Sequence, residues 1–156
     1  MSRRSSVRCA TRDTRQLAAY IDTSVLASII VEDAHTERVR LWLPTAAGRL
    51  TLSDWTVTEF TSAVGAVQRA GRMTADERQA AERAVDAWVA RSGAALPVLS
   101  EDIRQARSLM TATAQALKAP DALHLAIVRR TGATLASLDT GMRRAAADLG
   151  VALETI

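Results

Sequence analysis

The sequence is poor in cysteine, aromatic residues, glycine and proline, and each shortage excludes a class of protein. Cys9 is the only cysteine in 156 residues, so an internal disulfide framework and a cysteine-based zinc site are excluded. Aromatic residues make up 3% of the chain, so the core must be built mainly from alanine, leucine, valine and isoleucine. Seven glycines and three prolines exclude collagen-like and Pro/Gly-rich disordered chains. With 48% hydrophobic residues, the length suits one ordinary globular domain.

Lysine is also scarce, and the positive charge is concentrated at one end of the chain. Lys118 is the only lysine among 20 basic residues. Residues 1–15 hold five arginines and one aspartate, so they account for more than the whole net charge of +3. A domain-wide basic face for nucleic acid is therefore not expected. We expect residues 1–17 to be a basic, disordered tail and residues 18–156 to be the folded domain; a basic arm that touches RNA or a partner is the alternative for the tail.

No apolar run is long enough for a membrane helix. The run from Val25 to Val31 spans seven residues and contains Ser28, whereas a membrane span needs about 20 residues. The pair Arg3 and Arg4 is followed by more arginines rather than by the apolar stretch of an export signal. We therefore expect a cytoplasmic protein without membrane contact.

From residue 18 onward, short apolar runs alternate with longer stretches of helical periodicity. Strands are predicted at residues 18–21, 49–52, 96–99, 134–138 and 151–153. Helices are predicted at residues 23–31, 34–43, 55–70, 100–117, 120–130 and 140–149, with one more between Thr74 and Gly93. Strands separated by helices imply right-handed crossovers. The pattern therefore predicts a single three-layer α/β domain with a mostly parallel, five-stranded sheet flanked by helices.

Local signals support the predicted helix boundaries. Thr74 followed three residues later by Glu77 is typical of a capping box. Gly93 and Gly132 each follow a helical stretch, where glycine commonly ends a helix. Ser100 is the expected N-cap of the helix that follows the strand at 96–99.

Four carboxylates lie where the active site of a parallel α/β sheet is expected, beyond the carboxyl ends of the strands. Asp22 and Asp139 directly follow predicted strands, Glu59 lies early in a helix and Asp121 lies in the first turn of another. No arginine or lysine lies within three residues of Asp22 or Glu59. A cluster of unpaired, half-buried acids needs protonation or a cation, and all-oxygen ligands favour Mg²⁺ or Mn²⁺.

Each carboxylate also has a purely structural interpretation. Asp22 and Asp139 can cap the helices that follow them, and Asp121 can favour the helix dipole. Glu59 can be solvated on a helix surface. Among the specific alternatives, the sequence has no G-x-G-x-x-G after the first strand, no phosphate-binding P-loop motif and no G-x-S-x-G elbow. An acidic metal site remains the best of the specific interpretations.

Four segments resemble one known family. They are Y-I-D-T-S-V-L at 20–26, L-S-D-W-T-V-T-E at 52–59, P-D-A-L-H-L-A at 120–126 and L-A-S-L-D-T-G-M-R-R-A-A-A-D-L-G at 135–150. Their order and spacing resemble PIN domains, most closely the VapC-type toxins of bacterial toxin–antitoxin pairs, over about residues 18–153. The resemblance implies a five-stranded parallel sheet between helices. It also implies a Mg²⁺ or Mn²⁺ site for RNA cleavage at Asp22, Glu59, Asp121 and Asp139, with hydroxyls at Ser24 and Ser137 nearby.

The resemblance implies a function and partners. A metal-dependent endoribonuclease toxin is expected, with an RNA substrate, a VapB-like antitoxin and a homodimeric assembly, and with cleavage that leaves a 5′-phosphate and a 3′-hydroxyl. Two other functions stay open: a catalytically silent PIN-like module that binds RNA or protein, and a metal-dependent DNA nuclease that is not a toxin.

Other polar residues near these motifs have two interpretations each. His124 is expected to pack or to hydrogen-bond a site residue, with metal ligation as the alternative. Trp55 is expected in the core, with base stacking as the alternative. Candidate phosphate contacts, for which a solvated face is the alternative, are Arg104, Arg107, Arg143 and Arg144.

Overall fold

A four-stranded parallel sheet lies at the centre of the molecule in the computed structural model, which describes residues 17–156. The predicted tail at residues 1–17 lies outside the described residues except for Leu17. The strands are β1 (Ala19–Ile21), β2 (Leu50–Ser53), β3 (Ala95–Leu96) and β4 (Thr134–Ala136). Their order is β3-β2-β1-β4, and every neighbouring pair is parallel.

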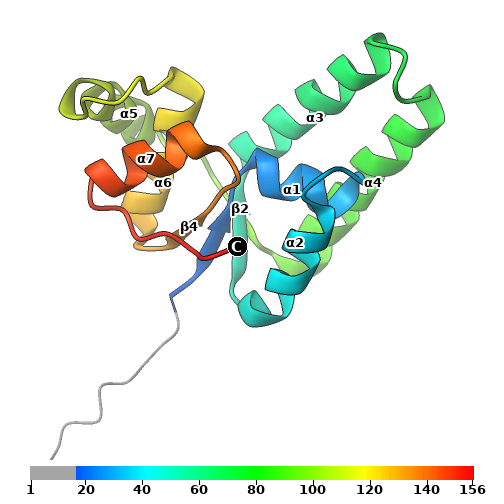
Figure 1. The fold of residues 1–156 in the computed structure, drawn as a ribbon, viewed down its shortest axis with the longest axis horizontal. Coiled ribbons are helices and arrows are strands. Elements are labelled where there is room, and N and C mark those ends of the chain that lie inside the picture. Colours follow the sequence, from blue (N-terminus) through cyan, green and yellow to red (C-terminus); the bar gives the residue numbers. More distant parts are fainter. Residues whose placement is uncertain (1–16) are drawn as a thin grey trace, which may run out of the picture.

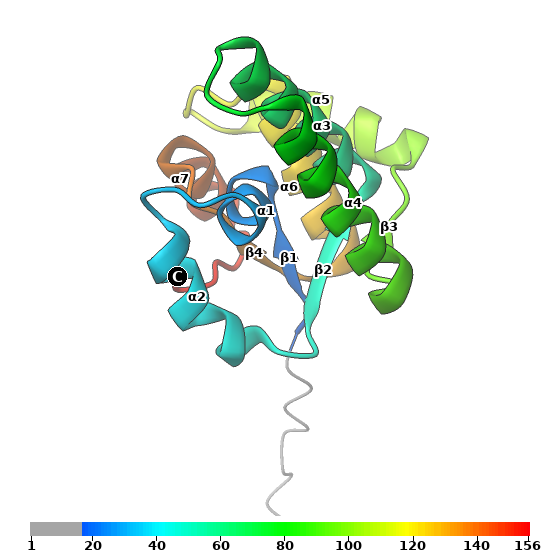
Figure 2. The ribbon, with the colours of Figure 1, turned by 90° about the vertical axis from the view of Figure 1, so that its right-hand side faces the viewer.

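Helices cover both faces of this sheet, which confirms the predicted three-layer α/β fold (Figure 1 and Figure 2). One layer contains α1 (Thr23–Ile30), α2 (Thr36–Trp42), the 3-10 helix η1 (Leu43–Ala46), α3 (Asp54–Arg69) and α4 (Ala75–Ser92). The other layer contains α5 (Ser100–Ala112), α6 (Ala119–Thr131) and α7 (Thr140–Asp148). The hairpin of α3 and α4 extends beyond the sheet in Figure 1.

The predicted fifth strand at residues 151–153 is wrong, because only one residue of that segment pairs with the sheet. Leu153 forms an isolated parallel bridge with Leu135 of β4. Two backbone hydrogen bonds of 2.8 Å, from Leu135 N to Ala152 O and from Glu154 N to Leu135 O, hold this segment. Since β4 itself has three residues and Gly150 turns the chain just before the segment, no longer ladder forms.

Two hydrophobic cores lie on opposite faces of the sheet, as the alternation of side chains along a strand requires. Tyr20 and Leu135 belong to the core with α5, α6 and α7, whereas Ile21 and Ala136 belong to the core with α1 to α4. Alanine, leucine, valine and isoleucine dominate both cores, as the composition predicts.

The structure confirms some helix boundaries and corrects others. Thr74 and Glu77 form the predicted capping box, and Gly93 ends α4 with a φ of 61°. The strand predicted at 96–99 ends at Leu96, because Pro97 has no N–H to donate to a ladder. Ser100 is not the N-cap of α5: Leu99 takes that position, and its N–H donates to Asp102. The helix predicted to residue 117 ends at Ala112.

A partly buried ion pair joins α5 to α6, the helix that carries Asp121. Arg130 Nε and Nη2 donate to the two oxygens of Asp102 at 2.7 and 3.0 Å. Asp102 is fully buried, whereas the Arg130 side chain is 27% exposed. The pair therefore fixes the packing of α6 against α5 at a point where the carboxylate has lost its hydration.

Replacing Asp102 with alanine is expected to lower the free energy of unfolding by about 2–3 kcal/mol. The loss comes from the two charge-assisted hydrogen bonds between Arg130 and Asp102 and from the unsatisfied N–H of Leu99 at the start of α5. Urea unfolding followed by circular dichroism measures it. The control is Arg104→Ala, which breaks the exposed pair with Glu101 and should cost less than about 1 kcal/mol. Equal losses in the two variants would contradict the structural role of the partly buried pair.

Candidate active site

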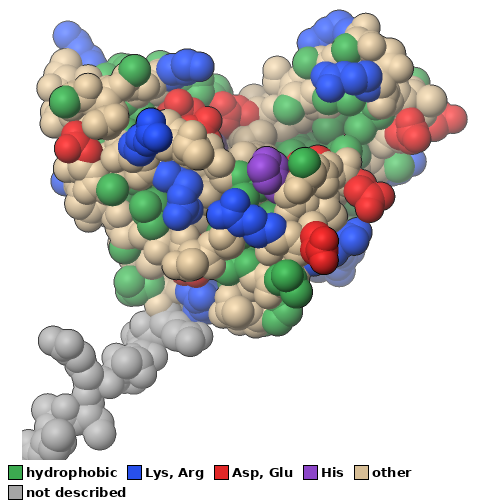
Figure 3. Space-filling model, in the orientation of Figure 1, with side chains coloured by type: hydrophobic (Ala, Val, Ile, Leu, Met, Phe, Trp, Pro, Cys, Tyr) green, Lys and Arg blue, Asp and Glu red, His purple; other side chains and the backbone are tan. Residues whose placement is uncertain are grey.

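The candidate site lies where the carboxyl ends of β1, β2 and β4 meet. Ile21 of β1 is in register with Ala136 of β4, and the N–H of Asp22 donates to Ala136 O at 3.1 Å. Asp22 and Ser137 therefore leave neighbouring strands side by side. Figure 3 shows a hollow at the top of the view, between the block of α5 to α7 and the α3–α4 hairpin, with acidic side chains on its left wall.

Asp22 is the most buried of the four candidate carboxylates, with 3% of the residue exposed. Its Oδ1 accepts from Ser24 Oγ at 2.7 Å and from Val25 N at 3.0 Å, and its Oδ2 accepts from Ser137 Oγ at 2.6 Å. Burial raises the pKa of Asp22 although the hydroxyls of Ser137 and Ser24 and the N–H of Val25 act in the opposite direction. Asp22 is also the N-cap of α1, so its structural interpretation is correct as well.

The two serines connect Asp22 to the loop after β4. Ser24 Oγ accepts from Leu138 N at 2.9 Å, and Ser137 Oγ accepts from Asp139 N at 3.0 Å. Asp139 is exposed and caps α7 through a 2.7 Å hydrogen bond from Met142 N to its Oδ1. The chain thus holds Asp22 and Asp139 in one hydrogen-bonded arrangement.

Glu59 is half-buried on α3 and is held from two sides. Its Oε2 accepts from Thr23 Oγ1 at 2.8 Å, and His124 Nε2 lies 2.6 Å from the same oxygen. Burial alone would raise the pKa of Glu59, but the hydrogen bond and charge of His124 and the hydrogen bond from Thr23 lower it. The solvated interpretation of Glu59 is therefore wrong, and the predicted hydrogen bond of His124 to a site residue is confirmed.

The hydrogen bonds of a buried tyrosine behind His124 were not predicted from the sequence, although Tyr20 begins the first of the four motifs. The Tyr20 hydroxyl lies 2.7 Å from His124 Nδ1, 2.7 Å from Ser53 Oγ and 3.1 Å from Thr56 Oγ1. The available signal was the lone tyrosine of the chain inside an apolar strand, because a buried phenol usually needs a hydrogen-bond partner.

Asp121 lies in the first turn of α6, and the other acids affect its pKa. Burial raises its pKa first, followed by the charge of Asp139 and, more weakly, that of Glu59. The charges of His124 and Lys118 act in the opposite direction. The carboxylates of α3, α6 and the β4–α7 junction are therefore close enough to interact electrostatically.

These residues fit a hard divalent cation by their chemistry. Over residues 17–156, no ion pair joins an arginine or lysine to any of the four carboxylates. Their oxygen donors are those that Mg²⁺ and Mn²⁺ prefer. Within the same described stretch, no three acidic, histidine or cysteine side chains form a ready-made metal cluster. Metal ligation by Asp22, Glu59, Asp121 and Asp139 therefore stays a prediction.

Two of the candidate phosphate-contact arginines form hydrogen bonds or an ion pair within the protein. Arg143 Nη1 donates to the backbone oxygens of Ser137 and Glu154, and Arg104 pairs with Glu101. Arg107 and Arg144 are exposed. Trp55 is partly buried and packs against the core with α5 to α7, as its core interpretation predicts.

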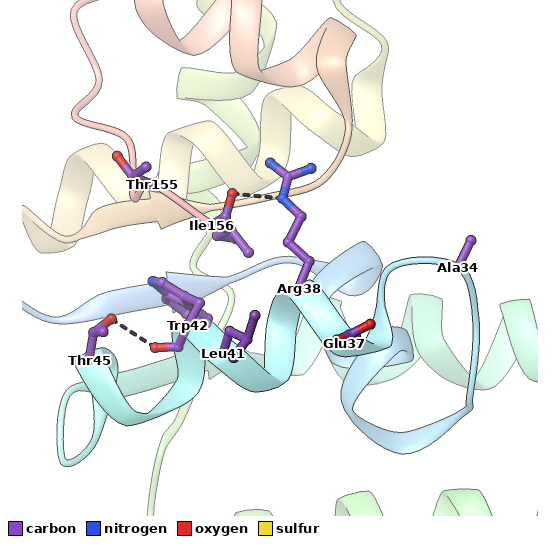
Figure 4. Close-up of a pocket in the computed structure, with 8 residues that line it drawn as sticks. All are labelled: Ala34, Glu37, Arg38, Leu41, Trp42, Thr45, Thr155 and Ile156. Atoms are coloured by element: carbon purple, nitrogen blue, oxygen red, sulfur yellow. Dashed lines mark hydrogen bonds between the residues drawn. The ribbon is translucent and has the colours of Figure 1, made fainter.

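A separate pocket lies away from the carboxylates, between α2 and the C-terminal segment (Figure 4). It has a volume of about 550 Å³, and none of the four candidate acids lines it. Arg38 Nε donates to the backbone oxygen of Ile156 across it at 2.7 Å. The pocket therefore belongs to the packing of the C-terminal segment and not to the candidate site.

A comparison with models of known protein families shows which family the chain belongs to. A family model of the PIN domain matches residues 19–148. The chain belongs to the PIN-domain family. The resemblance drawn from the four sequence motifs is thereby confirmed. A comparison with curated proteins gives no significant match.

Solved structures share this PIN fold at low sequence identity. FitAcB from Neisseria gonorrhoeae is 22% identical with a TM-score of 0.68, over 88% of this chain and 96% of that chain. VapC20 of Mycobacterium tuberculosis, described as a sarcin–ricin loop cleaving toxin, is 17% identical with a TM-score of 0.64, over 82% and 95%. A toxin–antitoxin complex from Klebsiella pneumoniae is 17% identical with a TM-score of 0.56, over 79% and 88%.

Among the described helices, none combines the length and apolar character needed to cross a bilayer.

Proposed function

We propose that this PIN-domain protein is a Mg²⁺- or Mn²⁺-dependent endoribonuclease and the toxin of a type II toxin–antitoxin pair. The observation that carries the proposal is the meeting of elements bearing four carboxylates at one edge of the sheet. In the described part of the chain, no arginine or lysine neutralises them through an ion pair. The descriptions of two structural neighbours, a sarcin–ricin loop cleaving toxin and a toxin–antitoxin complex, support it.

Each carboxylate has a proposed role that follows from its surroundings. Asp22, Glu59 and Asp121 are the proposed metal ligands, and Asp139 serves a second ion or a water in the site. A bound divalent ion supplies activation of water and neutralisation of charge on the scissile phosphate. The hydroxyls of Ser24 and Ser137 orient the Asp22 carboxylate. Because these contacts exist before substrate arrives, the protein does not reorganise them during the reaction.

Purified protein and labelled oligonucleotides test the activity. We expect cleavage of single-stranded or loop RNA in Mg²⁺ or Mn²⁺, loss of cleavage in EDTA, and products with 5′-phosphate and 3′-hydroxyl ends. Cleavage of DNA but not RNA would instead indicate the DNA nuclease. RNA binding without cleavage in either metal would indicate the silent module.

The proposed partners are an antitoxin and a second copy of the chain, in the cytoplasm. Co-expression with a small DNA-binding protein encoded next to this gene should relieve growth arrest caused by this chain alone. Light scattering of the purified chain should give twice the monomer mass. Growth arrest that no adjacent gene product relieves would contradict the toxin–antitoxin assignment.

Deletion of residues 1–15 is expected to leave RNA cleavage unchanged within about twofold, because the proposed site lies wholly in the domain at residues 18–156. The deletion removes five arginines and one aspartate. Cleavage rates of the full and shortened chains, measured across a salt series, check this expectation. A large loss of activity at low salt that shrinks as the salt concentration rises would show instead that these residues bind nucleic acid.

A further inference from the structure

We infer that Tyr20 and His124 form a buried positioning pair that commits one carboxylate oxygen of Glu59 to the protein and leaves the other for a metal ion. The inference deepens the proposed function, because it rests on Glu59 as a metal ligand. Its geometric part concerns hydrogen bonds that exist without any metal.

The pair lies in the core and joins three separate elements. Tyr20 of β1 is 0% exposed and His124 of α6 is 2% exposed. The tyrosine hydroxyl lies 2.7 Å from His124 Nδ1, and His124 Nε2 lies 2.6 Å from Oε2 of Glu59 on α3. The two rings meet edge to face, with centroids 5.7 Å apart and planes at 64°. Strand, helix and site carboxylate are thus connected through one imidazole ring.

The neighbours of the Tyr20 hydroxyl allow it to donate to His124. A phenol hydroxyl ordinarily keeps its proton near neutral pH. Ser53 Oγ accepts the N–H of Thr56 as the cap of α3, which leaves the serine proton free for the tyrosine oxygen. Tyr20 can then donate to His124 Nδ1.

The contact between His124 Nε2 and Glu59 Oε2 indicates that Nε2 carries a proton. If Nε2 carried no proton, its lone pair would face an ionised carboxylate oxygen at 2.6 Å, which is repulsive. With the proton on Nε2, the contact becomes a short hydrogen bond to charge. The Tyr20 hydroxyl, which lies at hydrogen-bond distance from the opposite nitrogen, fixes the ring orientation that directs Nε2 at Glu59.

Glu59 receives both of its hydrogen bonds on the same oxygen. Oε2 accepts from Thr23 Oγ1 and from His124 Nε2, and no residue between 17 and 156 donates to Oε1. Rotation of the carboxylate would break two hydrogen bonds, one of them to a buried ring. Oε1 is therefore the oxygen that remains for a cation.

Four variants separate positioning from mere core packing, with Mn²⁺ alone as the probe in calorimetric titrations. His124→Leu should weaken Mn²⁺ binding about 10–100-fold, as loss of a partner that orients a metal ligand typically does. Tyr20→Phe should weaken it about 10-fold. His124→Gln keeps an N–H donor near the Nε2 position and should restore most of the affinity. Thr51→Val, which removes a buried hydroxyl of β2 bonded to Ala94 O, should leave it unchanged.

Nitrogen-15 NMR of the metal-free protein tests the geometry independently of activity. We expect a protected N–H signal at His124 Nε2 that shifts in Tyr20→Phe and in Glu59→Gln but not in Thr51→Val. This result supports the hydrogen-bonded pair even if the wild type cuts no RNA, an outcome that refutes the proposed function alone. A wild type that binds no Mn²⁺ would refute the metal-ligand role of Glu59 as well. A bare Nε2 in the wild type, or wild-type Mn²⁺ affinity in folded His124→Leu, overturns the inference.

Discussion

Replacing Asp22 with asparagine is expected to reduce metal-dependent RNA cleavage by at least about 100-fold. Loss of a residue that only orients a metal ligand already costs up to about 100-fold, and loss of a ligand should cost at least as much. The substitution removes the charge that the proposed ion needs but keeps the shape of the side chain. Asparagine Oδ1 can still accept from Val25 N as the cap of α1, and its amide can donate to Ser137 Oγ. Asp121→Asn should have a similar effect, because it removes a second proposed ligand.

Cleavage assays on both variants, with circular dichroism and urea unfolding, check this expectation. The matched control is Glu101→Gln, which neutralises an exposed carboxylate on α5 that pairs with Arg104. Its cleavage rate should equal that of the wild type. Full activity in both folded site variants would remove Asp22 and Asp121 from the site.

Divalent metal is expected to stabilise the folded protein, and the benefit should vanish in Asp22→Asn and Asp121→Asn. At a free concentration of about 100 times the Kd, a ligand that binds the folded state alone adds about 2.7 kcal/mol. For a domain of this size, that corresponds to a rise in Tm of about 5–10 °C. Thermal unfolding in Mn²⁺, in Mg²⁺ and in EDTA measures the shift. RNA cleavage without any metal-dependent change in Tm would contradict the proposed ligands.

The pH dependence of the metal-free protein has a defined sign at Asp22. Burial raises the pKa of Asp22 in the folded state, so between the unfolded and folded values the folded protein binds more protons. The Asp22 contribution to stability therefore falls as pH rises through that window and stays low above it. Unfolding of Asp22→Asn lacks this loss, and the stability of the variant relative to wild type should increase with pH. A constant difference across the window would show that the carboxylate is not desolvated.

The sequence was sufficient for the fold class and for the placement of the acids, because both follow from local order. Asp22 directly follows β1 and Asp139 lies three residues after the end of β4, and parallel strands bring their carboxyl ends to one edge. The fifth strand could not be judged from its apolar residues, because the register that leaves Leu153 with a single bridge depends on the turn after α7. The number of residues in this segment that pair with β4 is therefore set by tertiary packing and not by the residues of the segment itself.

The supporting hydrogen bonds were harder to predict than the acids. His124 could be given a hydrogen bond because it lies three residues after Asp121 on one helix. Tyr20 lies 104 residues before His124, and Thr23 lies 36 residues before Glu59. No periodicity in the chain links such positions, so these contacts emerge only once β1, α3 and α6 are packed together.

The double use of Asp22 and Asp139 as helix caps has a consequence for how this protein can be silenced. Both residues start a helix through one carboxylate oxygen, and asparagine starts a helix equally well. Under the proposed function, exchanging a single oxygen for nitrogen is therefore expected to remove activity without disturbing the fold, whereas alanine is expected to impair both. Such a single substitution is expected to give folded, inactive copies that still compete for the partners of the intact protein.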